Sequence, residues 1–273
     1  MGHLRIVKYL FQDLNCNAEI TGLTVLKQTP LHLAAQNGYL FIVSYLINEA
    51  KYDPSCIDIN GMTPLHLACI GGHLNVVRWL ITDAQCNPFP RDLCNLTPLA
   101  YAAKYGHVDV VKHLVAQLNC IPSFVSDALY CAIDNEHYEV AKFLAYCDDG
   151  NTRIEPGETP LHRAALHGNI KVLKYLCEVM NFDPSSSDCQ TKITPLHCAS
   201  ISGHLSIVKY LTLEKNCTIM YKDSDGITPL HAAALHGHLE VVKFFVRDML
   251  CDPQLKSNDQ STPLHYMLLR KAT

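Results

Sequence analysis

Histidine and cysteine are the residues of this sequence that most readily suggest chemistry. The chain of 273 residues contains 15 histidines and 13 cysteines, and both residue types can bind metals or act in catalysis. The cysteines include no Cys-x-x-Cys pair, and the two that lie closest in sequence are Cys86 and Cys94. The sequence also lacks a His-Glu-x-x-His motif, a nucleophile elbow and a glycine-rich phosphate loop. We therefore expect no enzyme, no cofactor and no metal ligands.

Most of the histidines follow an internal repeat. The tetrapeptide Thr-Pro-Leu-His begins at Thr29, Thr63, Thr159, Thr194, Thr228 and Thr262, and a variant begins at Thr97 with Ala100 in place of histidine. One repeat lacks the tetrapeptide, and Asp127 stands where its threonine is expected. With Asp127 included, successive anchors lie 30 to 35 residues apart. A period of this size is typical of a solenoid of stacked structural repeats.

The register of the repeat gives most of these residues a structural role. Six histidines belong to the anchor, where we expect the ring to bond to backbone near a loop and so tie one repeat to the next. Six more follow the glycine, or its substitute, that ends each first helix: His3, His73, His107, His137, His204 and His238. Five cysteines share one further position of the repeat: Cys16, Cys86, Cys120, Cys217 and Cys251. We expect their side chains to be small, buried and inert.

Each repeat predicts two short helices. Thr is a good N-cap, and Pro suits the first helical position because the N–H that it lacks would have no partner there. A glycine such as Gly203 then supplies the left-handed residue at which the first helix ends. In the segment 73–81, apolar residues recur at the helical period and predict a second helix. Turn signals such as Asp53-Pro54 precede the next anchor.

These features resemble the ankyrin-repeat family over essentially the whole chain. The resemblance implies an all-α solenoid of helix–turn–helix units with short β-hairpin loops, whose tips we expect near residues 58–61, 92–95, 223–226 and 257–260. It predicts one array over residues 1–273, with partial repeats at 1–28 and 262–273. The full repeats are expected at 29–62, 63–96, 97–126, 127–158, 159–193, 194–227 and 228–261. The irregular repeats at 97–158 indicate either a bend or local opening of the array, or sequence drift alone.

The resemblance also implies a binding surface, because the family usually grips partners on a concave face made of hairpin tips and of the residues before the helix-ending glycine. The positions of this sequence that match the family's residues before the helix-ending glycine are Gln36, Asn37, Ile70, Gly71, Lys104, Tyr105, Asp134, Asn135, Leu166, His167, Ile201, Ser202, Leu235 and His236. Leu166, Ile201 and Leu235 fall in successive repeats and predict an exposed apolar stripe. The hairpin tips add a second rank of expected partner contacts: Ile59, Asn60, Met62, Leu93, Cys94, Leu96, Ser224, Asp225 and Ile227. The alternative is that some of these side chains pack against the neighbouring hairpin and do not contact a partner.

Charge and composition restrict the partners. The formal net charge is −4, which gives no basic footprint for nucleic acid. We find no signal peptide and no apolar segment long enough for membrane insertion, so we expect a reducing intracellular compartment, the cytoplasm or else the nucleus. The sequence opens in a second helix and closes within a first helix, which suggests a piece of a longer array. We expect a monomer if the terminal repeats are covered.

Two classes of function are compatible with this sequence. The first is a non-catalytic interaction scaffold that binds a protein or peptide. The second is the substrate-recognition or targeting section of a larger protein, such as a ubiquitin-ligase adaptor, a phosphatase regulatory subunit, or a channel or membrane-skeleton linker. The polar residues are accounted for by the register of the repeat, so a self-contained enzyme is the weakest alternative.

Overall fold

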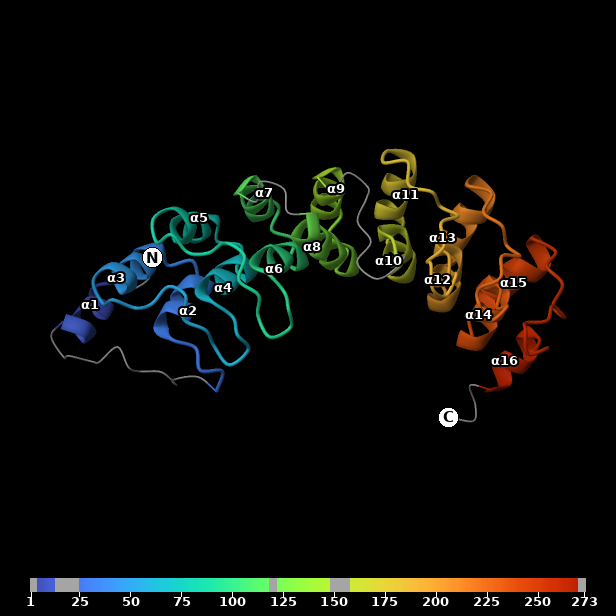
Figure 1. The fold of residues 1–273 in the computed structure, drawn as a ribbon, viewed down its shortest axis with the longest axis horizontal. Helices are drawn as coiled ribbons and strands as arrows, with labels where there is room; N and C mark the ends of the chain where they lie inside the picture. Colours follow the sequence, from blue (N-terminus) through green and yellow to red (C-terminus); the bar gives the residue numbers. More distant parts are fainter. Residues whose placement is uncertain (1–3, 13–24, 118–121, 148–157, 270–273) are drawn as a thin grey trace. The chain divides into compact units, whose positions relative to one another are not determined.

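The computed structural model describes residues 4–12, 25–117, 122–147 and 158–269. These residues form two compact units, unit 1 (Met1–Phe143) and unit 2 (Leu144–Thr273), which we describe one at a time. All regular elements in these ranges are helical (Figure 1). The expected all-α fold is therefore confirmed.

Unit 1 consists of short paired helices. First helices pack against first helices, and α2, α4 and α6 also pack against the second helix that follows each of them. The elements are α1 (Leu4–Gln12), α2 (Pro30–Gln36), α3 (Leu40–Asn48), α4 (Pro64–Ile70), α5 (Leu74–Thr82), α6 (Pro98–Lys104), α7 (Val108–Gln117), α8 (Pro122–Asp134) and α9 (Tyr138–Cys147), in which the division between the units falls. Two layers of helices result, with the loops at one edge.

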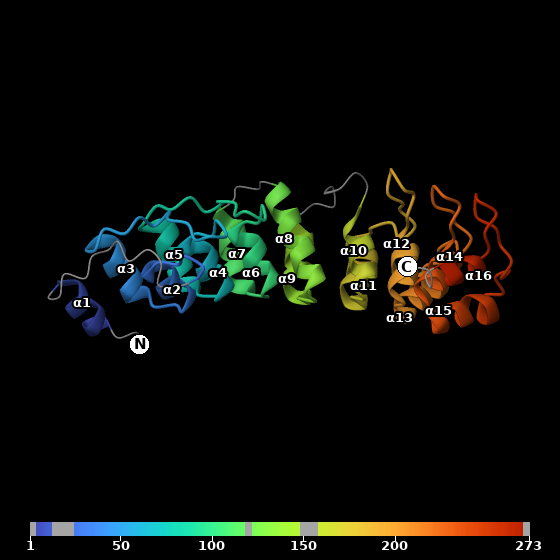
Figure 2. The same cartoon turned by 90° about the horizontal axis from the view of Figure 1, so that it is seen from below.

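Unit 2 has the same layered arrangement. Its second helices α13 and α15, which are labelled in Figure 2, are prolonged by π-helical turns, η1 and η2. The elements are α10 (Pro160–Leu166), α11 (Ile170–Glu178), α12 (Pro195–Ser202), α13 (Leu205–Lys209), η1 (Tyr210–Glu214), α14 (Pro229–His236), α15 (Leu239–Lys243), η2 (Phe244–Asp248) and α16 (Pro263–Leu269).

The helix boundaries follow from the anchor residues. Thr194 is extended, its hydroxyl accepts the backbone N–H of His197, and Pro195 begins α12. The helix ends at Gly203, which has a φ of 76°. A Cβ atom at Gly203 would also collide with the ring of His238 from the next repeat, so two independent constraints require glycine there.

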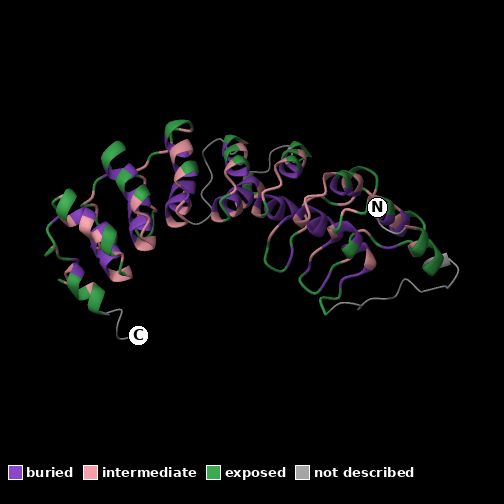
Figure 3. Ribbon diagram, turned by 180° about the vertical axis from the view of Figure 1, so that it is seen from behind, coloured by how far each residue is buried: buried purple, intermediate pink, exposed green. Residues whose placement is uncertain are grey.

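The apolar core lies between the two helix layers of each unit, where the ribbon faces are buried (Figure 3). Leu65 from a first helix and Leu80 from a second helix are almost completely buried in unit 1. Small residues such as Ala68 are fully buried as well, and their size allows neighbouring helices to approach closely. The core is thus divided into layers that each repeat extends.

Two features differ from the sequence-based expectations. Helix α8 begins at Pro122, ahead of Asp127, so the expected division between residues 126 and 127 lies inside a helix. Pro122 can start a helix, whereas Asp127-Ala128 provides no Thr-Pro signal to begin one there. The loops make hairpin-like turns, but the described residues contain no β-strand, because each turn is closed by only a few backbone bonds.

Candidate partner-binding surface

Five of the six anchor histidines join two repeats in the described residues. The Nδ1 atom of His197 accepts the backbone N–H of Thr194 at 3.3 Å. Nε2 lies 3.1 Å from the carbonyl oxygen of Ile227, just before the next anchor. Because a carbonyl can only accept, Nε2 carries the proton and the ring is neutral. His32, His66, His162 and His231 make equivalent contacts, which confirms the expected tie between repeats.

Burial keeps these rings from charging. It lowers the pKa of His32, His66, His197 and His231, and their hydrogen bonds to backbone carbonyls oppose that effect only in part. Desolvation disfavours the imidazolium because the ring loses the water that would stabilise its charge. These side chains are therefore built as neutral structural bridges.

The histidines that follow the glycines bind the ends of the preceding first helices. Nε2 of His204 donates to the carbonyl of Leu166 at 3.0 Å, and Nε2 of His238 donates to Ile201 at 2.7 Å. In unit 1, His73, His107 and His137 donate in the same way, at 2.9 Å, to the carbonyls of Gln36, Ile70 and Lys104. The helix ends that carry the predicted binding residues are thereby fixed, whereas His3 lies outside the described residues.

In unit 1 the predicted helix-end residues are partly accessible. Tyr105 is exposed, and so are Asn37 and Asn135, whose side-chain amides donate to the carbonyls of Leu33 and Cys131. The others are half-buried: Gln36, Ile70, Gly71, Lys104 and Asp134. These side chains lie at equivalent ends of α2, α4, α6 and α8, which are neighbours in the first-helix layer.

The predicted apolar stripe in unit 2 is less exposed than its sequence suggested. Leu166, Ile201 and Leu235 do lie at the same end of the neighbouring helices α10, α12 and α14, but each is half-buried. The histidine of the following repeat reaches over the helix end and covers part of it, as His204 does at Leu166. The adjoining predicted residues His167, Ser202 and His236 are half-buried too.

Aspartates, buried at Asp58 and Asp92 and half-buried at Asp223, hold the loop tips in shape. Oδ1 of Asp58 accepts the backbone N–H groups of Asn60 and Met62 at 2.8 and 2.9 Å. Asp92 accepts equivalently from Cys94 and Leu96, and Asp223 from Asp225 and Ile227. Each carboxylate therefore replaces backbone bonds that a strand would otherwise provide.

Successive tips are bonded to one another. The backbone N–H of Ile59 donates to the carbonyl of Leu26 at 2.9 Å, and that of Leu93 donates to Asn60 at 3.0 Å. The side chains of Val25, Ile59 and Leu93 are 95%, 46% and 78% exposed. We call these three residues the hairpin row.

Unit 2 presents polar residues at the same register. The position four residues before the anchor threonine holds Gln190, Ser224 and Asn258, all exposed. The tips are again bonded in series, with Ser224 N–H donating to Thr191 at 2.8 Å and Asn258 N–H to Asp225 at 3.0 Å. The predicted contacts Ser224 and Asp225 are thus accessible, and the apolar tips belong to unit 1.

Sequence reasoning missed Val25 and gave Ile59 and Leu93 only second rank. All three share one register position, four residues before Thr29, Thr63 and Thr97. That alignment was the available signal, but a sequence alone does not tell whether such a side chain packs on the next hairpin or faces solvent. In the structure they are more exposed than any residue of the predicted stripe.

The thiols of the core are suited to packing rather than to reaction. Burial raises the pKa of Cys86 to about 11 and that of Cys198 to about 12, and it raises the pKa of Cys69, Cys217 and Cys251. A thiol needs to ionise before it acts as a nucleophile, and burial disfavours that ionisation at these side chains. Cys16 and Cys120, which share the register of Cys86, lie outside the described residues.

The residues that the structure describes contain neither a cluster of metal-ligating side chains nor a membrane-spanning helix. No group of three or more His, Cys, Asp or Glu side chains is placed to hold a metal ion in that part of the chain. Among the same residues, no helix is long and apolar enough to cross a bilayer.

Comparison with known proteins identifies the family. The family profile described as "Ankyrin repeats (3 copies)" matches residues 1–92, 83–155, 147–223 and 213–271. The chain therefore belongs to the ankyrin-repeat proteins, which are generally protein–protein interaction modules and typically non-catalytic.

A solved structure supports the fold. The crystal structure of the human ASB11 ankyrin repeat domain is similar, with a TM-score of 0.64 and 22% sequence identity over 78% of this chain and 97% of that one. At this identity the likeness shows the fold alone. Comparison with curated protein sequences gives no match.

Proposed function

We propose that this chain is a non-catalytic scaffold that binds a protein or peptide partner. The hairpin row of unit 1 carries the proposal, because Val25, Ile59 and Leu93 are apolar and exposed where the matching positions of unit 2 are polar. Clustered exposed apolar side chains on a soluble domain are typical of interaction sites. Tip-to-tip bonds and the buried aspartates hold the row in one arrangement, which lowers the entropy lost on binding.

The ends of the first helices complete the proposed surface. In unit 1 they add Asn37 and Tyr105, which give polar and aromatic contacts beside the row. In unit 2 the half-buried stripe of Leu166, Ile201 and Leu235 is a separate proposed contact. In ankyrin-repeat proteins, the equivalent positions of each repeat face the concave side of the array.

We further propose that the protein works in a reducing compartment, the cytoplasm or the nucleus. Buried thiols with a raised pKa, such as Cys69 and Cys198, support this location because they serve as small apolar residues. The net charge of −4 favours a protein partner over nucleic acid.

A peptide library displayed on phage tests the proposal. Peptides selected on the wild-type chain are titrated against the triple variant V25K/I59K/L93K and against the matched triple variant Q190K/S224K/N258K. The proposal predicts that the unit 1 variant loses binding while the unit 2 variant retains it, with unchanged helical circular dichroism in both. Equal binding to these three proteins contradicts the proposed surface. A further triple variant, L166K/I201K/L235K, is titrated in the same way. Loss of binding in this variant alone assigns the binding site to the stripe instead.

A further inference from the structure

In each unit, lysine side chains of second helices lie over aromatic rings of the second helix that follows. The lysine is the fifth residue of its helix, and the ring is the sixth residue of the next. The distances from lysine Nζ to ring centre are 5.5 Å for Lys8 and Tyr45, 4.7 Å for Lys174 and Tyr210, and 5.7 Å for Lys209 and Phe244. These distances are within the range of cation–π attraction. We call this arrangement the cation–aromatic row.

One ring in the row lacks its cation. The ring is that of Trp79 in α5, and the fifth residue of the preceding second helix α3 is Ser44. The other second helices have lysine or arginine at this position: Lys8, Arg78, Lys112, Lys142, Lys174, Lys209 and Lys243. Serine is too short to cover a ring, and its hydroxyl here donates to the carbonyl of Phe41 at 3.1 Å. Among the described residues no lysine or arginine covers Trp79, which is half-buried, whereas the three covered rings are buried.

Trp79 lines an open groove between α3 and α5. The groove has a volume of about 510 Å³, and its apolar wall is made by Leu40 of α3 and Leu74 of α5 together with Trp79. Both helices are internal to unit 1, because α1 packs on α3 and α7 packs on α5. All residues from 25 to 117 are described. The groove is therefore a feature of neighbouring repeats within the array.

The charges that line the groove suit a cation. Asp83 follows α5 directly and is exposed, and none of the described lysines or arginines pairs with it. Its Oδ2 atom accepts the hydroxyl of Thr82 at 2.7 Å. The other charged residue of the lining, Arg78, occupies the next place in the row. Burial and, after it, the charge of Arg78 lower the pKa of His113 in α7. Asp83 is thus the carboxylate left to bind a cation from outside.

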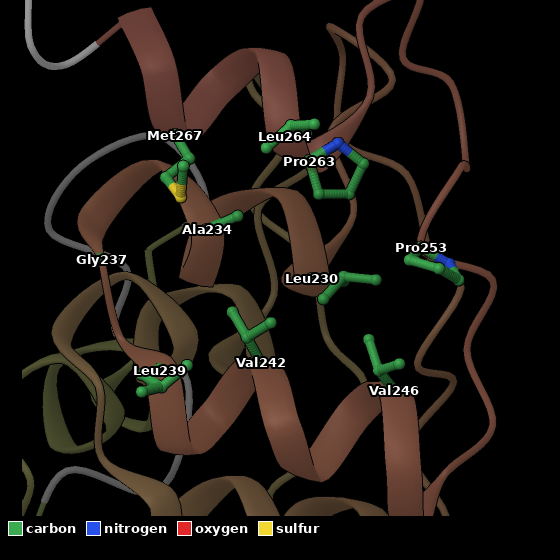
Figure 4. A pocket seen from close by; sticks show the side chains of 10 residues that line it. All are labelled: Leu230, Ala234, Gly237, Leu239, Val242, Val246, Pro253, Pro263, Leu264 and Met267. Atoms are coloured by element: carbon green, nitrogen blue, oxygen red, sulfur yellow. The ribbon is translucent and has the colours of Figure 1, made fainter.

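A hollow in unit 2 shows by contrast what distinguishes this groove. The pocket in Figure 4 lies among α14, α15, η2 and α16 and has a volume of about 270 Å³. The residues that line it, among them Leu230, Val242 and Met267, are all uncharged and non-aromatic. That pocket offers a cation neither a carboxylate nor the face of a ring.

We propose that the groove between α3 and α5 binds a lysine side chain of a partner protein. The ammonium group lies over the Trp79 ring, which Ser44 leaves uncovered, and Asp83 supplies the opposite charge. The methylene groups of the lysine lie along Leu40 and Leu74. The occupant is assigned as lysine because lysine makes all three contacts of this kind described above. The groove shares no residue with the hairpin row, so the two sites are tested independently.

Trp79 is the only tryptophan of the chain, which makes a test specific to the site. The indole N–H signal of the isotope-labelled full chain is followed by NMR during titration with n-butylammonium chloride, which has the side chain of lysine alone. A saturable shift of the signal is expected. n-Butanol, which has the same carbon chain without the charge, should bind about tenfold more weakly, and sodium chloride at the same ionic strength controls for screening.

Ser44→Lys supplies the missing cation from the chain itself. Its ammonium group should cover Trp79, so that the affinity for n-butylammonium falls by about tenfold or more. Asp83→Asn should weaken binding as well, because it removes the opposite charge. Ser206→Lys makes the same substitution at an exposed serine of α13 in unit 2 and is the matched control, which should titrate like the wild type. Circular dichroism checks that all three variants fold.

A capped peptide Leu-Lys-Leu extends the test to a lysine within a polypeptide. It should shift the Trp79 signal, and the same peptide with an acetylated lysine should not, because acetylation removes the charge. The proposal is overturned if the signal gives no saturable response to n-butylammonium or to the lysine peptide. It is also overturned if n-butanol binds as well as n-butylammonium, which would assign an apolar ligand, or if Ser44→Lys binds like the wild type.

Discussion

The substitution Gly203→Ala tests how the repeats are joined. Gly203 has a φ of 76°, and alanine in this left-handed region costs about 1–2 kcal/mol. The added methyl group would also displace the His238 ring, whose Nε2 donates to the Ile201 carbonyl at 2.7 Å. Loss of that part-buried bond costs about 1–3 kcal/mol, so we expect a total loss of stability of about 2–5 kcal/mol.

A double-mutant cycle separates these two contributions. In the background His238→Ala there is no ring to displace, and Gly203→Ala should cost only about 1–2 kcal/mol. Gly237→Ala is the matched control, since Gly237 is exposed and has a φ of 77°. Urea unfolding followed by circular dichroism gives the free energies. If Gly203→Ala costs the same with and without the His238 ring, the reasoning about this junction is refuted.

Three further predictions concern the histidines, the loops and the thiols. Burial lowers the pKa of His32, His66, His197 and His231, so the unfolded chain binds protons more readily. Stability is then fully present above a pH of about 6.5 and declines as the pH falls towards the folded-state pKa values. Urea unfolding should show a loss of about 1 kcal/mol or more between pH 7.5 and 5, and a flat profile would contradict the proposed neutral bridges. Asp223→Ala removes the acceptor of two backbone hydrogen bonds in the loop and should lower stability by about 1–3 kcal/mol. Asp225→Ala, at an exposed position of the same loop, should change stability by less than about 0.5 kcal/mol. Equal effects of the two substitutions in thermal unfolding would show that Asp223 does not stabilise the loop. In native protein at pH 8, a thiol reagent should modify exposed Cys94 quickly and leave buried Cys69 intact, and rapid modification of Cys69 detected by mass spectrometry would show that the core is open.

Local structure was predictable because the residues at the helix ends act over short distances. Thr194, Pro195 and Gly203 determine the start and end of α12 without help from other repeats. The bond from His197 to the next repeat could be expected for the same reason, since the ring follows its own N-cap by three residues. Where the anchor is absent, the sequence offers no Thr-Pro signal, and α8 begins at Pro122, ahead of Asp127.

Exposure was harder to predict because it depends on neighbouring repeats. Leu166 looks exposed in sequence, but His204 binds its carbonyl and leaves the side chain half-buried. Leu93 occupies a loop whose contacts depend on the preceding hairpin, where Asn60 binds its backbone and leaves the side chain in solvent. A periodic pattern assigns residues to layers, but the partner across each layer decides what remains accessible.

Hydrogen–deuterium exchange tests the central claim, binding at the hairpin row, most directly. Exchange is measured by mass spectrometry with and without a peptide selected on the wild-type chain. We predict slower exchange in the unit 1 loops at residues 25–28, 57–62 and 91–96, where tip-to-tip bonds present Val25, Ile59 and Leu93. Protection confined to unit 2, or to the second helices, would contradict this account.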